Sequence, residues 1–317
     1  MIRPRKRYLM LFGVAMHVVM FGALLAGLGV VPLGATTDSP LDVAVTIPPQ
    51  AYLVERIGGE RVRVELAVPP GQDPHTFSPS PRQVMSLGRA TLYFRIGLPL
   101  EDQLLPRLTG RRRTMTVVDT TEGIKPRTFA ADEGHTCDGH HHHHGHGHNC
   151  QAHAGRPDPH VWLAPGLLSH QAERICDALC EADPAGRAFY RSNLRALQAR
   201  LDDAEAEITE KLAPYRGRAF YVFHPAFGHF ADAYGLRQVA VEMEGKTPSP
   251  RQLRALIAHA KDDKVKVIFV QPQFDQRSAE SIATAIGGTV VAMDPLRRDV
   301  IDNLMEITAH LQRGFER

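Results

Sequence analysis

The segment that decides the organisation of the chain is Pro184-Ala-Gly-Arg-Ala-Phe-Tyr-Arg-Ser-Asn-Leu-Arg-Ala-Leu-Gln-Ala-Arg-Leu-Asp-Asp-Ala-Glu-Ala-Glu-Ile-Thr-Glu-Lys-Leu-Ala-Pro214. Apolar residues recur in it at steps of four and three, at Tyr190, Leu194, Leu197, Leu201, Ala204, Ile208 and Leu212. This spacing predicts one long amphipathic helix. At about 1.5 Å per residue, the helix spans roughly 40 Å. We therefore expect a stiff brace between two lobes rather than a loose linker.

Short β-branched runs alternate with helical segments on both sides of this helix. Before it, we expect strands at 41–47, 61–68, 91–96 and 114–118, and helices at 52–57, 81–89 and 100–108. After it, we expect strands at 219–223, 238–241, 265–270 and 289–293, and helices at 249–260, 277–286 and 300–312. Such alternation is typical of parallel, doubly wound sheets.

The expected fold is therefore α/β, with two doubly wound parallel-sheet lobes joined by one long backbone helix. The N-terminal lobe covers residues 36–183, the linking helix 184–214 and the C-terminal lobe 215–317. The length of 317 residues allows a separate core in each lobe.

Residues 1–35 have the features of a secretory signal peptide. Basic residues precede a long apolar run, and Leu33-Gly-Ala35 offers small residues for cleavage. We therefore expect the mature protein in the periplasm. The apolar run is also long enough to cross a bilayer, so an uncleaved N-terminal anchor is the alternative.

The charge balance excludes one class of partner. Removing residues 1–35 takes away four Lys/Arg and no acidic residue, so the formal charge falls from +2 to −2. A chain that is close to neutral lacks the positive charge that nucleic acid attracts, so we expect no nucleic-acid partner.

Residues 131–155 form a low-complexity tract that is rich in histidine. It cannot bury an apolar face, so we expect a surface loop of the first lobe that binds metal weakly. Nine histidines belong to it: His135, His140, His141, His142, His143, His144, His146, His148 and His153.

The four cysteines form two pairs in the sequence. Cys137 and Cys150 bracket part of the histidine tract, and we expect a disulfide between them in an exported chain, with zinc ligation as the alternative. Cys176 and Cys180 lie four residues apart in a helical stretch, a spacing that seldom forms a disulfide. We expect these two to be small buried hydrophobic residues.

Three histidines outside the tract each adjoin a proline. His75 lies in a proline-rich loop after a predicted strand, His160 opens a helical segment, and His224 follows the run 219–223. The carboxyl ends of parallel strands are where ligands bind to doubly wound sheets. A lone histidine at such a position is more often a structural residue, but together with the tract the three indicate a metal site.

Asp294 extends the same pattern in the second lobe, because it directly follows the strand 289–293. We expect each lobe to supply ligands to a shared cleft: His75 and His160 from the first lobe, and His224 and Asp294 from the second. The remaining histidines, His170, His229, His259 and His310, are expected to be exposed or to make structural hydrogen bonds. Glu242 and Glu244 are expected to be surface charges.

An enzyme and a metal buffer are the competing functions. Three histidines and a carboxylate could hold catalytic zinc, but such zinc usually keeps an open water position, which four protein ligands would close. The chain has no His-Glu-x-x-His, Gly-x-Ser-x-Gly or Walker motif. In a zinc-buffering adhesin, the histidine tract would instead be the working part.

Several motifs together resemble the cluster A-I (cluster 9) metal-binding proteins of bacterial ABC importers, in their zinc-uptake branch. The resemblance covers essentially the whole mature chain. The matching motifs are Asp73-Pro-His-Thr-Phe-Ser-Pro-Ser80, Asp158-Pro-His-Val-Trp162, Asp183-Pro184, Tyr190-Arg-Ser-Asn193, Phe223-His-Pro-Ala-Phe227, Gly245-Lys-Thr-Pro-Ser249 and Asp294-Pro-Leu296.

The resemblance implies a protein that holds a metal ion between two lobes and delivers it to a membrane permease with a cytoplasmic ATPase. We expect this protein to be a monomer and not an enzyme. His75, His160 and His224 match the family's ligands. Asp294 matches the fourth position, where some zinc members instead use a water or a Glu next to the first histidine; here that neighbour is Pro74. Many relatives carry a Glu at the position of Gln271, which we leave out of the ligand set.

The third histidine favours Zn²⁺ as the transported ion. Imidazole nitrogen suits zinc, whereas carboxylate-rich sites suit manganese, and three histidines with one aspartate suit tetrahedral zinc. Manganese members of the family tend to carry a Glu at the position of His224. Manganese remains the alternative metal.

Overall fold

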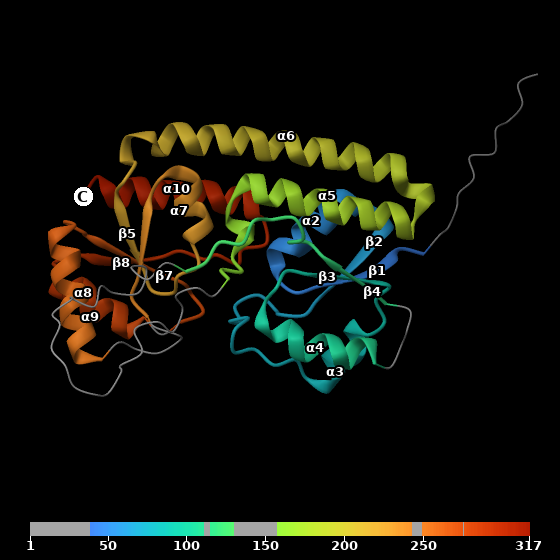
Figure 1. The fold of residues 1–317 in the computed structure, drawn as a ribbon, viewed down its shortest axis with the longest axis horizontal. Coiled ribbons are helices and arrows are strands. Elements are labelled where there is room, and N and C mark those ends of the chain that lie inside the picture. The colour runs from blue at the N-terminus through green and yellow to red at the C-terminus, as the bar shows by residue number, and fades with distance from the viewer. Residues whose placement is uncertain (1–38, 111–114, 130–156, 243–248, 275) are drawn as a thin grey trace, which may run out of the picture. The chain divides into compact units, whose positions relative to one another are not determined.

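Two parallel sheets of four strands each organise the part of the chain that the structure describes. The structure is a computed structural model that describes residues 39–110, 115–129, 157–242, 249–274 and 276–317 (Figure 1). The predicted signal peptide, the histidines of the tract, the Cys137–Cys150 disulfide and Glu244 lie outside these residues. None of the described helices is long and apolar enough to cross a membrane.

The first lobe is built around the sheet β2-β1-β3-β4, in which all strands are parallel. Its strands are β1 (Leu41–Val45), β2 (Val62–Leu66), β3 (Leu92–Arg95) and β4 (Thr116–Asp119), and its helices are α2 (Pro48–Gly58), α3 (Pro81–Leu87) and α4 (Pro99–Thr109). In the register of the sheet, Val43 of β1 pairs with Val64 of β2 and Leu92 of β3.

The second lobe repeats this strand order as β6-β5-β7-β8, again with all strands parallel. Its strands are β5 (Ala219–Val222), β6 (Arg237–Ala240), β7 (Val267–Val270) and β8 (Thr289–Ala292). Its helices are α7 (Gly228–Tyr234), α8 (Pro250–Asp262), α9 (Arg277–Ala285) and α10 (Val300–Phe315). The prediction of two doubly wound lobes is confirmed.

Helices α3 and α8 occupy equivalent places in the two lobes and begin with the same sequence, Ser-Pro-Arg-Gln. In each, the Gln side chain accepts a 2.9 Å hydrogen bond from the serine backbone, at Ser80 and at Ser249. The serine hydroxyl accepts in turn from the Gln backbone. This reciprocal capping box satisfies donors that the first helical turn leaves unpaired, so it determines where both helices start.

The predicted brace is helix α6 (Arg187–Leu212), which is 26 residues long. All seven of the apolar residues that predicted it are buried. It runs alongside α5 (Pro165–Ala182) and packs against α2 of the first lobe and α10 of the second (Figure 1). The prediction of one long helix joining the lobes is confirmed, whereas α5 was foreseen only in part and α7 was not foreseen.

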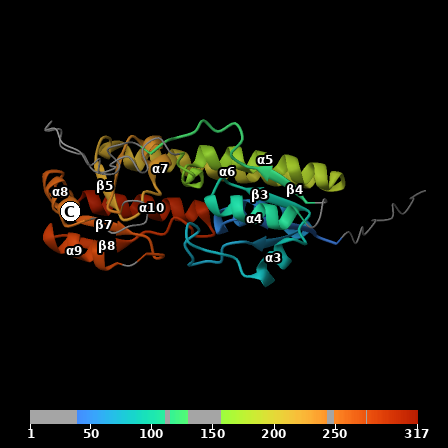
Figure 2. The same ribbon diagram turned by 60° about the horizontal axis from the view of Figure 1, so that its bottom comes forward.

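Successive side chains along a strand point to opposite faces of the sheet, so they belong to different hydrophobic cores. In β5, Phe220 and Val222 point to one face and Tyr221 to the other, as the two-residue period of a strand requires. One face of each sheet has its own small core, under α3 and α4 in the first lobe and under α8 and α9 in the second (Figure 2).

The expectation of two separate cores is wrong for the opposite faces of the sheets. The largest core cluster joins residues from both lobes, such as Val45 of β1 and Leu304 of α10, through the apolar face of α6. The brace is therefore a shared part of the core.

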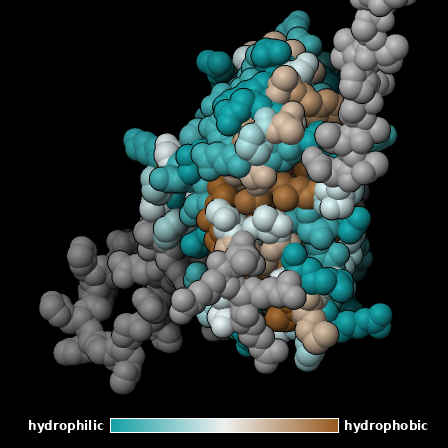
Figure 3. Space-filling model, turned by 90° about the vertical axis from the view of Figure 1, so that its right-hand side faces the viewer, coloured by the Kyte–Doolittle hydropathy of each residue, from teal (hydrophilic) through white to brown (hydrophobic). Residues whose placement is uncertain are grey.

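Outside the cores, the end of the first lobe shown in Figure 3 is largely hydrophilic, with hydrophobic side chains gathered in a smaller band.

Candidate metal centre

Three histidines from three separate segments meet at the carboxyl ends of the strands. His75 lies in the loop after β2, His160 immediately before the short 3-10 helix η2 (Val161–Leu163), and His224 just after β5. Each offers one ring nitrogen to a group whose atoms all lie within 4.8 Å of one another. The Nε2 atoms of His160 and His224 are 3.3 Å apart. Neutral imidazole nitrogens are good ligands for transition metals, so this is a candidate metal centre.

The pocket around these histidines is small. Its volume is about 20 Å³, which is enough for one ion or one water. Its other lining residues come from both lobes: Asp73, Pro74, Trp162, Ala226, Gln273, Phe274, Pro295 and Leu296. Trp162 also joins the two halves of the wall, because its indole N–H donates a 2.7 Å hydrogen bond to the carbonyl of Pro295. The size of the pocket fits capture of one ion.

His160 is oriented by Asp158. The Oδ1 atom of Asp158 lies 2.6 Å from Nδ1 of His160 and accepts a 3.0 Å hydrogen bond from the His160 backbone. A carboxylate on Nδ1 fixes the ring and leaves Nε2 for the metal. Burial lowers the pKa of His160, and this effect is larger than the attraction to Asp158, which acts to raise the pKa. Burial would raise the pKa of Asp158, but attraction and hydrogen bonding to His160 outweigh it, and that pKa is lowered.

His224 has an equivalent carboxylate, Glu242, and here the sequence-based expectation was wrong. Glu242 is only 3% exposed, and its Oε1 atom lies 2.5 Å from Nδ1 of His224. It follows the edge strand β6, whose carboxyl end lies beside that of β5. Glu242 is therefore a buried partner of a candidate ligand rather than a surface charge. Its position directly after a strand was the available signal.

The backbone of His224 is held on both sides by Gln271. The side-chain oxygen of Gln271 accepts a 3.1 Å hydrogen bond from the His224 amide, and its Nε2 donates a 2.6 Å hydrogen bond to the His224 carbonyl. The ring of Phe274 stacks on His224, with centroids 5.2 Å apart. Gln271 thus supports the candidate site without supplying a ligand.

His75 is presented by a turn that Asp73 stabilises. The carboxylate of Asp73 accepts a 2.9 Å hydrogen bond from the His75 backbone and a 3.0 Å hydrogen bond from the Thr76 hydroxyl. This arrangement leaves the His75 ring exposed, 4.9 Å from the His224 ring between centroids. His75 is therefore the solvent-facing member of the group.

Asp294 lies at the end of β8, outside the histidine group. Its Oδ1 atom accepts 2.9 Å hydrogen bonds from the Gln273 side chain and from the Leu296 backbone. Among the described residues, the group of ligand atoms within 4.8 Å contains the three histidines alone. The structure thus brings three of the four predicted ligands together and leaves Asp294 on the adjoining loop.

The remaining described histidines and cysteines lie away from this group. His229 and His170 make the structural hydrogen bonds that were expected, to the carbonyls of Asp158 at 3.1 Å and Glu122 at 2.8 Å. Cys176 and Cys180 are buried free thiols, as predicted. Burial raises the pKa of the Cys176 thiol to about 12, so it is not a ready metal ligand.

Two α/β lobes that meet at a histidine cluster with room for one ion define a candidate metal-binding protein. The family model for the zinc-uptake complex component A, periplasmic, matches residues 43–311, and the chain belongs to this family. The family consists of substrate-binding proteins of transporters rather than enzymes.

Individual relatives agree with this assignment. A putative metal-binding protein of Treponema pallidum is 30% identical over 262 residues, which is 82% of this chain and 80% of the relative. The high-affinity zinc uptake system protein ZnuA of Yersinia pestis is 26% identical over 82% of this chain and 84% of its own. The manganese ABC transporter substrate-binding lipoprotein PsaA of Streptococcus pneumoniae is 28% identical over 85% of each.

The fold comparison agrees as well. A crystal structure of ZnuA superposes with a TM-score of 0.76 and 36% identity, over 87% of this chain and 99% of the other. Because both zinc and manganese proteins are among the relatives, family membership establishes a metal-binding ABC substrate-binding protein and leaves the choice of metal to the site itself.

Proposed function

We propose that this protein captures Zn²⁺ in the periplasm and delivers it to the membrane permease of an ABC importer with its cytoplasmic ATPase, acting as a monomer. The observation that carries the proposal is the convergence of His75, His160 and His224 on one ion-sized pocket. Imidazole nitrogen suits zinc better than the hard, oxygen-preferring manganese ion.

The proposed ligand set is these three histidines with Asp294 as the fourth ligand. Zinc in a closed protein site is tetrahedral with four ligands. Asp294 is the candidate carboxylate from the second lobe, because Pro295 and Leu296 line the pocket directly after it. Asp73 also lines the pocket, but its carboxylate stabilises the turn that carries His75. To bind, its carboxylate would have to give up the hydrogen bonds from Gln273 and Leu296.

Nitrogen ligands also bind copper more tightly than zinc in the Irving–Williams order, so availability of the ion contributes to selectivity. Manganese is the competing cargo, because a relative is named for it. Against a metal-dependent hydrolase, the family to which the chain belongs consists of substrate-binding proteins of transporters.

The histidine tract is proposed to be an accessory, weaker site that concentrates zinc, since its composition gives it no apolar face to bury and its imidazoles must be ordered before they can chelate. A ZnuA structure is described as a deletion mutant with zinc bound. Deleting residues 135–153 should therefore leave one tight zinc site. Loss of tight binding on deletion would favour the metal-buffer function.

The proposal is tested by competition titration of metal-free wild-type and His160→Ala protein with zinc and manganese against a chromophoric chelator. Wild type should bind one zinc tightly and much more tightly than manganese. His160→Ala should lose that site and remain folded, since His160 is not one of the residues that form the large shared core. His310→Ala, on α10, is the matched control and should bind zinc as wild type does.

A further inference from the structure

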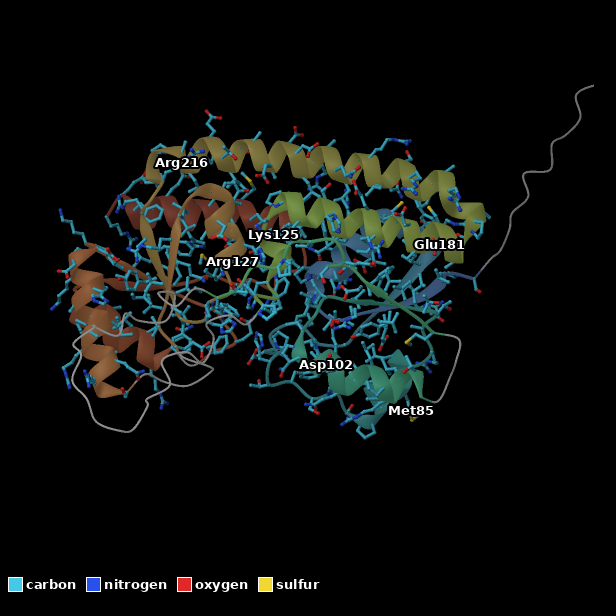
Figure 4. The ribbon with its side chains drawn as sticks, in the orientation of Figure 1. Met85, Asp102, Lys125, Arg127, Glu181 and Arg216 are labelled. Atoms are coloured by element: carbon cyan, nitrogen blue, oxygen red, sulfur yellow. The ribbon has the colours of Figure 1, made fainter. Side chains whose placement is uncertain are left out.

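Arg127 connects the carboxylate that orients His160 to the second lobe. Its Nη1 atom donates a 3.0 Å hydrogen bond to Oδ2 of Asp158, and its Nε donates a 2.9 Å hydrogen bond to Asp232 on α7. The Asp158 side chain is fully buried and the Arg127 side chain is 12% exposed, whereas Asp232 is largely exposed. Arg127 lies on the segment that runs between the two sheets (Figure 4).

The two oxygens of Asp158 therefore serve different partners. Oδ1 faces Nδ1 of His160, and Oδ2 faces the guanidinium of Arg127. A carboxylate held at both oxygens cannot turn about its bond, so the direction of the His160 ring depends on Arg127 as well as on Asp158. The Asp158 backbone amide also donates to the Arg127 carbonyl at 2.8 Å, which keeps the two residues in register.

Gly228 makes room for this contact. A Cβ atom at Gly228, the first residue of α7, would lie 2.4 Å from the Arg127 guanidinium carbon and 2.7 Å from Oδ2 of Asp158. Those distances are shorter than any real contact, so a side chain here would displace the guanidinium. The second lobe thus has a notch that fits Arg127, four residues after the candidate ligand His224.

We propose that Arg127 is a positioning residue for metal capture, which aligns His160 with His224 by bridging Asp158 of the first lobe to α7 of the second. This inference rests on the proposed function. The planar guanidinium suits the role, because it can donate to two carboxylates at once in a fixed geometry.

The direction of the change in zinc affinity on removal of Arg127 distinguishes a positioning role from an effect of its charge alone. A cation near a metal site repels the ion, so removing its charge alone would strengthen zinc binding. If Arg127 positions His160, removing it weakens zinc binding despite the relief of repulsion. We expect Arg127→Ala to weaken zinc affinity by about tenfold, as loss of an outer partner of a metal ligand typically does. Arg127→Lys should bind zinc more tightly than Arg127→Ala but less tightly than wild type.

Gly228→Ala is the second variant, and it leaves Arg127 in the sequence. It should weaken zinc binding in the wild-type background and have a smaller effect in Arg127→Ala, because the clash of its methyl group with the guanidinium is then gone and only the clash with Oδ2 of Asp158 remains. Arg298→Ala is the matched control: it breaks an ion pair with Glu55 between the first and second lobes that lies apart from the histidines. Its zinc affinity should equal that of wild type.

A readout without metal tests positioning directly. In metal-free protein labelled with ¹⁵N-histidine, the proton that His160 shares with Asp158 should give a distinct downfield NMR signal. That signal should be lost in Arg127→Ala and in Gly228→Ala and kept in Arg298→Ala. Circular dichroism and thermal unfolding show whether each variant is folded.

Three outcomes would overturn the inference: unchanged or tighter zinc binding in folded Arg127→Ala, an unchanged His160 signal, or additive losses in the Arg127→Ala/Gly228→Ala double variant. Failure of the wild-type protein to bind zinc would instead overturn the proposed function. The two failures are therefore distinguishable in one set of titrations.

Discussion

Oε1 of Glu242 lies 2.5 Å from Nδ1 of His224, so a carboxylate from the edge strand of the second lobe orients the third candidate ligand. Asp158 holds His160 in the same way. Both rings therefore present Nε2, and these two atoms are 3.3 Å apart. The pairing of each imidazole with a carboxylate is an arrangement typical of zinc-binding histidines.

Replacing Glu242 by Gln should weaken zinc binding by roughly tenfold or more, because loss of such a partner typically costs about 10–100-fold in metal affinity. Gln keeps the shape but loses the charge that makes the His224 ring a stronger ligand. Competition titration measures the effect. Glu207→Gln, which removes an exposed carboxylate paired with Lys211 on α6, is the control. Equal affinities for all three proteins would contradict this role of Glu242.

His224→Glu tests the basis of metal choice. Exchanging an imidazole for a carboxylate should weaken zinc more than manganese, because manganese prefers oxygen ligands. The ratio of the two affinities should therefore narrow relative to wild type in parallel competition titrations. An equal loss for both metals would mean that position 224 does not set the preference.

Acid should destabilise the metal-free protein through His160. Burial lowers the pKa of His160 in the folded state, whereas the unfolded imidazole takes up its proton near pH ~6.5. Between these two pKa values the unfolded chain binds more protons, so the free energy of unfolding falls as the pH falls through that interval.

Urea unfolding in the presence of a chelator measures this effect, at about pH 7.5 and about pH 5.5. The stability of His160→Gln should change less between the two conditions than that of wild type. Asp158, whose pKa is lowered, contributes only at more acidic pH, below the ordinary range of a carboxyl. An equal pH dependence in both proteins would show that His160 is not the group responsible.

The shared core predicts that the two lobes unfold together. Leu201 lies in the apolar face of α6 and is 1% exposed. Leu201→Ala should lower the free energy of unfolding by about 2–5 kcal/mol, as truncation of a buried leucine does, and the transition should remain single. Chemical unfolding followed by circular dichroism and by the fluorescence of Trp162 tests both points. Two separate transitions would indicate independent cores.

The parts of the fold that follow from local periodicity could be predicted from the sequence. The spacing from Tyr190 to Leu212 predicted α6, and β-branched runs predicted the eight strands of the described residues. Helix α7 was not foreseen, because its seven residues are too few to show a helical period and it lacks the serine cap and proline that mark the start of the equally short α3. The shared core depends on contacts between segments far apart in the chain, about which local patterns carry no information.

The site was predictable to the extent that strand ends and proline-flanked histidines mark it. His75, His160 and His224 could be named, and they lie together. Glu242 was missed although it follows a predicted strand, because a charged residue is usually exposed and its burial depends on the pairing of β6 with β5. The hydrogen bond that Gln273 donates to Oδ1 of Asp294 likewise depends on a tertiary contact.

The most direct measurement is anomalous diffraction at the zinc absorption edge, from crystals of protein loaded with one equivalent of zinc. The strongest anomalous peak should lie at about 2.0–2.1 Å, the usual Zn–N distance, from one imidazole nitrogen each of His75, His160 and His224. For His160 and His224 that nitrogen should be Nε2, since Nδ1 faces a carboxylate. A strongest peak elsewhere, for example among His140–His148, would contradict the assignment of these three histidines as the tight site.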